Sequence, residues 1–185
     1  MRAVVTRVAG ASVTIAGNVN GRIGRGFLVL LGVGPNDTEE TADRLAEKIC
    51  NLRVFEDENG KMNLNLEQTG GALLVVSQFT LYADTSSRRP GFTGAAKPDA
   101  AIPLYERFMA HCRERGFDVQ HGEFGADMQV YSQNDGPLER ADGDCKESGN
   151  DRQPGKKDGT GHALFVSKGT IGSPGHPIGC HKYDL

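Results

Sequence analysis

The alternation of apolar and polar positions predicts a series of short strands along the first part of the chain. Residues 2–8 and 12–16 alternate with a period of two, as half-buried strands do. Residues 27–33 and 72–76 are unbroken apolar runs bounded by glycine, which indicates strands covered on both faces. Residues 127–133 alternate again, so a last strand is expected there.

Two helices are expected between these strands. Asp37 and Glu40 have the spacing of a capping box, and an apolar repeat with helical spacing then predicts a helix over residues 38–52. A second helix is expected over residues 100–115, with Pro103 in its first turn. Because strands and helices interleave, the pattern predicts an α/β domain.

The composition of the sequence changes at Pro137. Residues 138–185 number 48 and include 14 charged side chains and 9 glycines, with one compact apolar cluster at residues 163–166. So little apolar surface does not offset the ordering entropy of about 1 to 2 kcal/mol per residue. The sequence therefore predicts a folded domain over residues 1–137 and a polar, glycine-rich tail over residues 138–185 that is mostly irregular.

The overall charge limits the partners that the protein can attract. The 21 Lys and Arg against 24 Asp and Glu give a net charge of -3, so any contact with nucleic acid must be a local patch. No apolar stretch has the roughly 18 residues of a membrane span, and the first residues lack the apolar run of a signal peptide. We expect a cytoplasmic protein with no membrane partner, in which the four cysteines are reduced thiols.

Several common catalytic and metal-binding patterns do not occur in the sequence. The glycine-rich run over residues 21–26 leads into a strand, whereas a dinucleotide-binding loop must open a helix, so we interpret it, with the pair Asn20-Gly21, as turn glycines. There is no G-x-S-x-G motif, and the cysteines and histidines of the tail lack structural-zinc spacing. His111 and His121 are expected to be ordinary surface or half-buried side chains. No metal or cofactor is expected.

Two polar segments stand directly after predicted strands. Residues 77–81 (SQFTL) follow the buried strand at 72–76, and residues 134–137 (NDGP) follow the last strand. Polar groups at the end of a central strand often bind ligands, and X-Pro is the linkage at which a cis peptide costs only about 0.5 to 1 kcal/mol. The simpler interpretation of each segment, a strand terminus with turn residues, stays open.

These two segments and several others resemble the D-aminoacyl-tRNA deacylase family. The matching pieces cover residues 1–137 in the same order and at the expected spacing, which is more specific than any one piece. They are MRAVVTRV (1–8), ASV (11–13), IGRG (23–26), LLGV (30–33), NLRVF (51–55), SQFTL (77–81), ADT (83–85), RP (89–90), FGADM (124–128) and NDGP (134–137). The resemblance implies a compact layered α/β fold with a mixed or antiparallel sheet and two helices. It also implies a homodimer in which each Gly-Pro corner enters the other subunit's pocket.

The resemblance implies hydrolysis of the ester between a D-amino acid and the 3′ end of tRNA, as a proofreading step, with glycyl-tRNA mischarged on tRNA-Ala as a further substrate. Because an aminoacyl ester is already activated, positioning and charge stabilisation suffice. By family analogy, backbone groups around Ser77, Gln78 and Phe79 hold the aminoacyl end. Activation of water by the 2′-hydroxyl of the terminal adenosine, with Thr80 positioning the ester, is favoured over Thr80 as nucleophile because no base for Thr80 is visible.

Selectivity for D-substrates has its own expected residues. By the same resemblance, a cis peptide between Gly136 and Pro137 of the partner subunit excludes L-substrates by sterics. Arg7 matches the position that braces this corner. Phe124 and Met128 match the pocket wall or the adenine site, with core packing as the alternative for both.

The match fails after Pro137, where the family has Val-Thr and a final strand and this chain has Leu138-Glu139-Arg140. Loss of the strand would leave a sheet edge unpaired and loosen the corner. Three explanations stay open: a substitute strand at residues 164–166, a lineage-specific arm, or a change of reading frame that replaces the native end.

Two other functions are weighed against deacylation. One is a non-catalytic nucleic-acid or partner-binding dimer that uses the tail, and the other is an editing domain for a different mischarged tRNA. The tail carries 7 Lys and Arg against 7 Asp and Glu, which is weak support for nucleic-acid binding.

Overall fold

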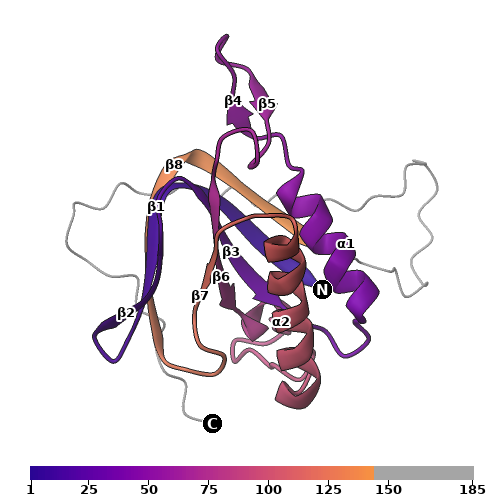
Figure 1. Ribbon diagram of the computed structural model, residues 1–185. Helices are drawn as coiled ribbons and strands as arrows, with labels where there is room; N and C mark the ends of the chain where they lie inside the picture. The colour runs from indigo at the N-terminus through magenta and orange to yellow at the C-terminus, as the bar shows by residue number, and fades with distance from the viewer. Residues whose placement is uncertain (144–185) are drawn as a thin grey trace.

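The computed structural model describes the backbone of residues 1–143 and the side chains of residues 1–136. It has a mixed sheet with two helices on one face (Figure 1). The elements in chain order are β1 (Arg2–Ile15), β2 (Asn18–Ile23), β3 (Gly26–Gly32), α1 (Glu39–Cys50), β4 (Phe55–Glu56), β5 (Met62–Leu64), β6 (Ala72–Ser77), the 3₁₀ helix η1 (Phe79–Tyr82), α2 (Pro98–Glu114), β7 (Val119–His121) and β8 (Met128–Gly143).

The main sheet has the order β2-β1-β3-β6-β7, and β8 pairs with β1. Strand β1 is antiparallel to β2, β3 and β8, whereas β3, β6 and β7 run parallel. Strand β2 comes close to β7, since the Asn20 side-chain amide donates to the His121 carbonyl at 2.9 Å and a Cβ at Gly21 would lie 2.8 Å from the same oxygen. The sheet is therefore nearly closed, and the expected mixed α/β fold with two helices is confirmed.

The central strands separate two apolar cores. Along β3, Phe27, Val29 and Leu31 belong to the core under the helices, whereas Leu28 belongs to a second core on the opposite face of the sheet. Strand β6 divides its side chains in the same way, with Leu73 on the helix side. Because both faces are buried, these strands have no polar alternation, and the prediction of strands covered on both faces is confirmed.

The turn between β1 and β2 lies earlier than the Asn20-Gly21 pair that the sequence suggested. Ile15 pairs with Asn18, so the turn consists of Ala16 and Gly17, which both have positive φ, +50° and +82°. Two residues with positive φ are typical of a tight hairpin turn. Asn20 and Gly21 lie inside β2, where the small size of glycine allows the close approach to β7.

Helix α1 begins with a different cap from the one expected. The Thr38 hydroxyl accepts from the Thr41 N–H, and the Thr41 hydroxyl accepts from the Thr38 N–H, which forms the capping box. The Asp37 carboxylate instead accepts from the Gly34 N–H at 2.6 Å and from the Tyr82 hydroxyl at 3.4 Å, and it pairs with the Met1 amino group. Because the Asp37 carboxylate already has these three donors, it does not cap the helix.

Helix α2 begins at Pro98, earlier than expected, and Pro103 lies inside it. Pro98 is the better helix start because it occupies the first turn, where its missing N–H has no intrahelical acceptor. Neither helix of the described chain is long and apolar enough to cross a membrane.

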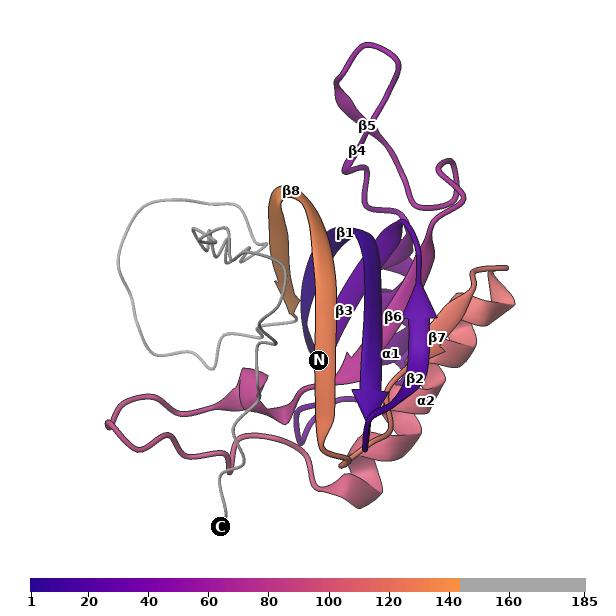
Figure 2. The same ribbon diagram turned by 90° about the vertical axis from the view of Figure 1, so that its left-hand side faces the viewer.

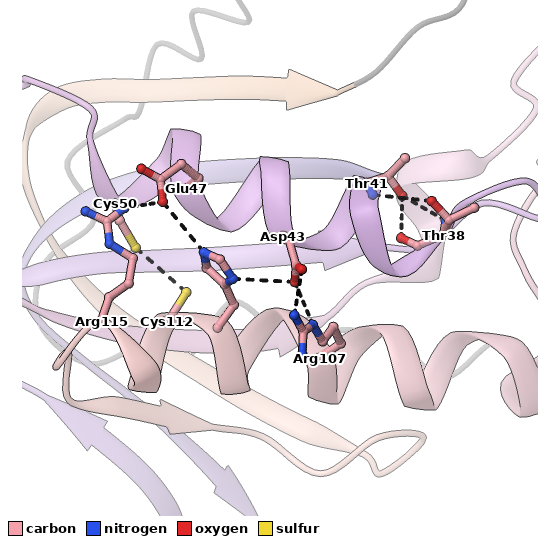
Figure 3. A network of polar contacts seen from close by, with 9 residues as sticks. Thr38, Thr41, Asp43, Glu47, Cys50, Arg107, Cys112 and Arg115 are labelled. Carbon is pink, nitrogen blue, oxygen red and sulfur yellow. Dashed lines mark hydrogen bonds and ion pairs between the residues drawn. The ribbon is translucent and has the colours of Figure 1, made fainter.

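Charged side chains join the two helices along their outer seam (Figure 3). The Arg107 guanidinium donates two hydrogen bonds to the Asp43 carboxylate, at 2.7 and 2.6 Å, and holds its pKa below the ordinary value. Arg115 donates to Glu47 at 2.7 Å, and the His111 ring lies between the two carboxylates. His111 is half-buried and His121 is exposed, as expected for ordinary side chains.

Below this seam, the buried thiols of Cys50 and Cys112 approach to 3.8 Å between their sulfur atoms, and both are free. The expectation of reduced thiols is confirmed for these two residues. Cys145 and Cys180 lie outside the described residues.

Strand β8 continues past Pro137, where the composition of the sequence changes. Its backbone pairs with β1 as far as Gly143, which lies opposite Arg2, and Glu139 lies opposite Thr6. The expectation of irregular structure is therefore wrong for residues 138–143. Backbone hydrogen bonds need no particular side chains, so the altered sequence can still cover the edge of β1. The rest of the tail lies outside the described residues. It includes the apolar residues 164–166 and the cysteines and histidines that were considered as metal ligands.

Candidate active site

The segment after β6 forms a compact turn against the end of β3. The Gln78 N–H donates to the Leu31 carbonyl at 2.7 Å, and the chain then enters η1. A Cβ on Gly32 would lie 2.9 Å from the Gln78 carbonyl oxygen, and a Cβ on Gly34 would lie 2.8 Å from the Tyr82 hydroxyl. These two glycines allow η1 to lie directly on the end of β3.

The side chains of this turn face solvent. Phe79 is 56% exposed, Thr80 is exposed, and Ser77 and Gln78 are half-buried. The Gln78 amide nitrogen donates to the Thr80 hydroxyl oxygen. An amide N–H does not accept a proton, and no His, Asp or Glu side chain among residues 1–136 hydrogen-bonds to Thr80. The one side-chain hydrogen bond of Thr80 among these residues is therefore with the Gln78 amide.

Two backbone N–H groups at the start of η1 have no hydrogen-bond acceptor among the described residues. The first intrahelical bond comes from the Leu81 N–H, so the N–H groups of Phe79 and Thr80 precede it. Neither donates to a carbonyl or to a capping side chain among the described residues. Unpaired N–H groups at the start of a helix attract negative charge.

Contacts from residues that are distant in the sequence fix the position of η1. The Arg2 guanidinium donates to the Leu81 carbonyl at 2.8 Å and lies 4.4 Å from the centre of the Tyr82 ring. Asp37, interpreted from the sequence as a helix cap, accepts from Tyr82 on the other side. These residues lie far apart along the chain, so no local pattern reveals their contact.

Phe124 and Met128 lie at the same end of the sheet as η1. The Gly122 N–H donates to the Val75 carbonyl at 3.1 Å, which brings the loop between β7 and β8 beside the end of β6. The Phe124 ring packs edge-on against Tyr105 at 6.0 Å, and Met128 packs against the second core. Both side chains are half-buried, so they combine core packing with an exposed edge.

Gly136 lies in a bulge of β8. Asn134 pairs with Val8 and Glu139 pairs with Thr6, so residues 135–138 oppose Arg7 alone. Gly136 has φ of +74°, which only glycine adopts without strain. Such bulges redirect the chain away from the sheet. The structure therefore has a bulge in β8 at the position of the expected Gly-Pro corner.

Arg7 holds this corner from within the protein. It is 8% exposed, and its guanidinium donates to the Asp135 carbonyl at 2.9 Å and to the Val54 carbonyl at 2.6 Å. The Asp135 carboxylate lies 3.3 Å from the same group. The expectation that Arg7 braces the corner agrees with these contacts.

The cis linkage expected at Gly136-Pro137 is not found. No cis peptide bond occurs among the described residues, and both residues lie within β8. The positive φ of Gly136 and the extra residues of the bulge already change the direction of the chain.

The turn at η1 and the Gly136 bulge of one chain lie at opposite ends of the main sheet. Figure 2 shows how β8 bends alongside β1. Arg7 lies level with Phe27 and Leu73, whereas Ser77 lies level with Leu31. The separation along the strands is about 13 Å, with three strand spacings of about 4.8 Å across the sheet. The structure brings Ser77, Gln78, Phe79, Thr80, Phe124 and Met128 to one end, and Arg7 and Gly136 to the other.

No group of three or more metal-binding side chains occurs among the described residues. The arrangement consists of exposed backbone donors, a hydroxyl without a base and a braced corner. Such a set can stabilise developing negative charge but offers no strong side-chain nucleophile.

Replacement of Arg7 by lysine tests the brace. Lysine keeps the charge, but its single ammonium group does not span two carbonyls that lie in different directions. We expect the free energy of unfolding to fall by about 2 kcal/mol, because one buried carbonyl loses its donor. Urea denaturation measures the change, with Arg22→Lys on exposed β2 as the matched control. A loss no larger than that of the control would contradict the brace.

Comparison with known proteins places the chain in a family. Residues 4–140 match the family model described as D-Tyr-tRNA(Tyr) deacylase. A D-aminoacyl-tRNA deacylase of Shewanella baltica (strain OS185) is 57% identical over 139 residues, which cover 75% of this chain and 96% of the relative. The D-aminoacyl-tRNA deacylase of Thermus aquaticus is 59% identical over 139 residues, which cover 75% of this chain and 91% of that relative.

Solved structures share the fold. The structure named c-Myc DNA Unwinding Element Binding Protein is 42% identical, with a TM-score of 0.73, and the match covers 76% of this chain and 97% of that one. A probable eukaryotic D-amino acid tRNA deacylase is 18% identical with a TM-score of 0.67 over the same shares, which supports the fold alone. From the family match and the close relatives together, the chain belongs to the D-aminoacyl-tRNA deacylase family.

Proposed function

We propose that the protein hydrolyses D-aminoacyl-tRNA with backbone groups of η1, in a site that a second copy of the chain completes. Hydrolysis of the ester between a D-amino acid and tRNA is the activity of the family to which the chain belongs. The observation that carries the proposal is the pair of free N–H groups at Phe79 and Thr80, beside a hydroxyl with no base.

The reaction requires little from the side chains. When water attacks the ester carbonyl, negative charge develops on the carbonyl oxygen, and two fixed N–H donors stabilise that charge without reorganisation. The C–O bond to the 3′ oxygen then breaks, and this oxygen receives a proton as the free D-amino acid leaves. The 2′-hydroxyl of the terminal adenosine lies next to the ester: it accepts the proton of the attacking water and passes its own proton to the departing 3′ oxygen.

Thr80 acts as a positioning residue. Its hydroxyl oxygen accepts from the Gln78 amide, which fixes the hydroxyl next to the η1 donors and leaves its own proton free to donate to the substrate. Without a base this hydroxyl is a weak nucleophile, so the chemistry falls to water and the RNA.

The Gly136 corner reaches the site from a second subunit. Within one chain the corner and η1 lie at opposite ends of the sheet, so the corner contributes to catalysis only if two copies associate. A twofold dimer supplies two such composite sites. The rigid corner, held by Arg7, then excludes the side chain of an L-amino acid by sterics.

Glycyl-tRNA follows from this mode of selection. A filter that rejects a side chain in the L position has nothing to reject in glycine, which has no side chain. Glycine mischarged on tRNA-Ala is therefore a second substrate of the proposed site.

A role in binding nucleic acid without catalysis is the second candidate. It is favoured by the relative at 42% identity, whose name describes binding to a DNA unwinding element. Residues 138–185, which this alternative would use for binding, lie largely outside the described residues.

One assay separates these functions. Purified protein is incubated with D-tyrosyl-tRNA, L-tyrosyl-tRNA and glycyl-tRNA, and loss of the ester is followed. We expect rapid loss of the D and glycyl esters and retention of the L ester. Stable D-ester at micromolar protein would leave only the binding role, and equal loss of the D and L esters would contradict the steric filter.

Replacement of Phe79 by proline tests the backbone donor. Residue 79 is the first of η1, a position that tolerates proline, so the change removes the N–H but leaves the helix intact. We expect kcat to fall by about 10² to 10³, the cost of one oxyanion donor. Phe79→Ala removes the same exposed ring and keeps the N–H, so its kcat should change far less. Equal losses in the two variants would assign the effect to the ring.

Mixed dimers test the composite site. A Phe79→Pro chain carries an intact corner, and a Gly136→Ala chain carries an intact η1, although alanine is strained at φ of +74°. Because the corner excludes L-substrates, the readout is hydrolysis of L-tyrosyl-tRNA, which the Gly136→Ala dimer should cleave with its intact η1. After unfolding and refolding of an equal mixture, about half of the Gly136→Ala chains are paired with an intact corner of the partner, so loss of the L ester per Gly136→Ala chain should fall by about half. Unchanged loss of the L ester per Gly136→Ala chain would place both features in one chain.

A further inference from the structure

Residues 84–91, here called the arginine loop, project into solvent directly after η1. The loop is closed at its base by two backbone bonds, from the Asp84 N–H to the Gly91 carbonyl at 2.8 Å and from the Gly91 N–H to the Asp84 carbonyl at 2.9 Å. Every residue of the loop is exposed. Its sequence, DTSSRRPG, contains no large apolar side chain.

The base of the arginine loop is fixed to the candidate active site. Phe92, which follows the closing pair, packs edge-on against Phe79 with 5.3 Å between ring centres. A Cβ on Gly94 would lie 2.8 Å from the Tyr82 carbonyl, so the returning chain passes directly over η1. The loop therefore begins and ends beside the residues that the proposed function uses.

Charge in this region differs from that of the whole chain. Residues 77–97 contain three cationic side chains, Arg88, Arg89 and Lys97, against one acidic side chain, Asp84, although the chain as a whole has a net charge of -3. The Asp84 carboxylate accepts from the Ser86 N–H at 2.9 Å and is thus turned toward its own loop. The Arg89 carbonyl accepts from the Ser87 hydroxyl at 2.6 Å, but the guanidinium groups of Arg88 and Arg89 have no hydrogen-bond or ion-pair partner among residues 1–136.

We propose that Arg88 and Arg89 bind phosphates of the tRNA 3′ end, a few nucleotides before the terminal adenosine. This inference rests on the proposed function, which places the ester at η1. From the closing pair to its tip the loop spans about three residues, or about 10 Å of extended chain, and an arginine side chain adds further reach. Phosphates that close to the ester belong to the nucleotides just upstream of the terminal adenosine.

The chemistry of the loop suits RNA better than a protein surface. The core of a protein interface is enriched in aromatic side chains and methionine as well as arginine, and it is depleted in serine. The arginine loop offers only arginine, serine and threonine side chains around its tip, which are the groups that contact phosphate oxygens. It also supplies the local basic patch that an acidic chain needs for contact with tRNA.

Deacylation kinetics test the proposal with an Arg88→Ala/Arg89→Ala variant. On D-tyrosyl-tRNA we expect KM to rise about tenfold with kcat unchanged, and the slope of log KM against log salt to fall by about 1 to 2. On 3′-O-D-tyrosyladenosine, which has no phosphate, both constants should match the wild type. The charge-matched control is Arg44→Ala/Lys48→Ala on α1, which should leave the salt slope unchanged.

A parallel arm measures binding of uncharged tRNA, so the proposal stays testable even if the wild-type protein hydrolyses neither ester. In that case the proposed function fails, while weaker binding by the loop variant still supports the phosphate contact. Unchanged KM, salt slope and tRNA binding would overturn it. So would an equal loss of activity on the adenosine ester, or a shift to monomer in sedimentation, since either outcome makes the loop a structural or subunit contact.

Discussion

Strand β1 fixes the relative positions of the other functional segments, because its backbone pairs with three strands. Its first half lies between β3 and β8, and its second half lies between β2 and β8. The register of β1 against β3 sets the level of Arg7, and the register against β8 places the Gly136 bulge opposite it. A shift of one residue would turn the buried Arg7 to the other face and separate it from the corner.

A bulge keeps a fixed shape only when a neighbouring side chain holds it. Residues 135–138 lack strand partners, so they would be free to rearrange without a further contact. The Arg7 guanidinium supplies this contact through carbonyl groups, which every residue has. The corner therefore depends on one buried side chain and on backbone, and the altered sequence after Pro137 still pairs with β1 through its backbone.

At the other end of the sheet, the turn at η1 also depends on a few contacts and on its backbone. The turn at η1 is held by glycines that let it approach β3, by Arg2 and by Asp37, and it presents N–H groups rather than reactive side chains. An activated ester needs such donors more than it needs a nucleophile. Because the substrate's own hydroxyl lies beside the ester, the proposed site needs few catalytic side chains. Its selectivity comes from the shape of the corner.

The sequence by itself determined the long strands β1, β3, β6 and β8 and both α helices, because apolar periodicity reflects burial on one face or on two, but it did not reveal β2, β4, β5 or β7. It also marked residues 77–81 and Gly136 as unusual, and the resemblance to a family supplied the substrate that no local pattern encodes. Local spacing did not determine the helix start: Asp37 has the spacing of a cap, but its carboxylate accepts from Gly34 and Tyr82. Only the tertiary structure decided that contact, since its partners lie up to 45 positions apart.

The tertiary structure also decided that Ser77 and Gly136 lie at opposite ends of one chain, which the order of residues along the sequence does not reveal. Strand order and register arise from hydrogen bonds between distant backbone segments, and these bonds carry no residue-specific signal. The continuation of β8 to Gly143 has the same cause. Composition predicted irregular structure there, but the open edge of β1 pairs with the backbone of whatever sequence follows.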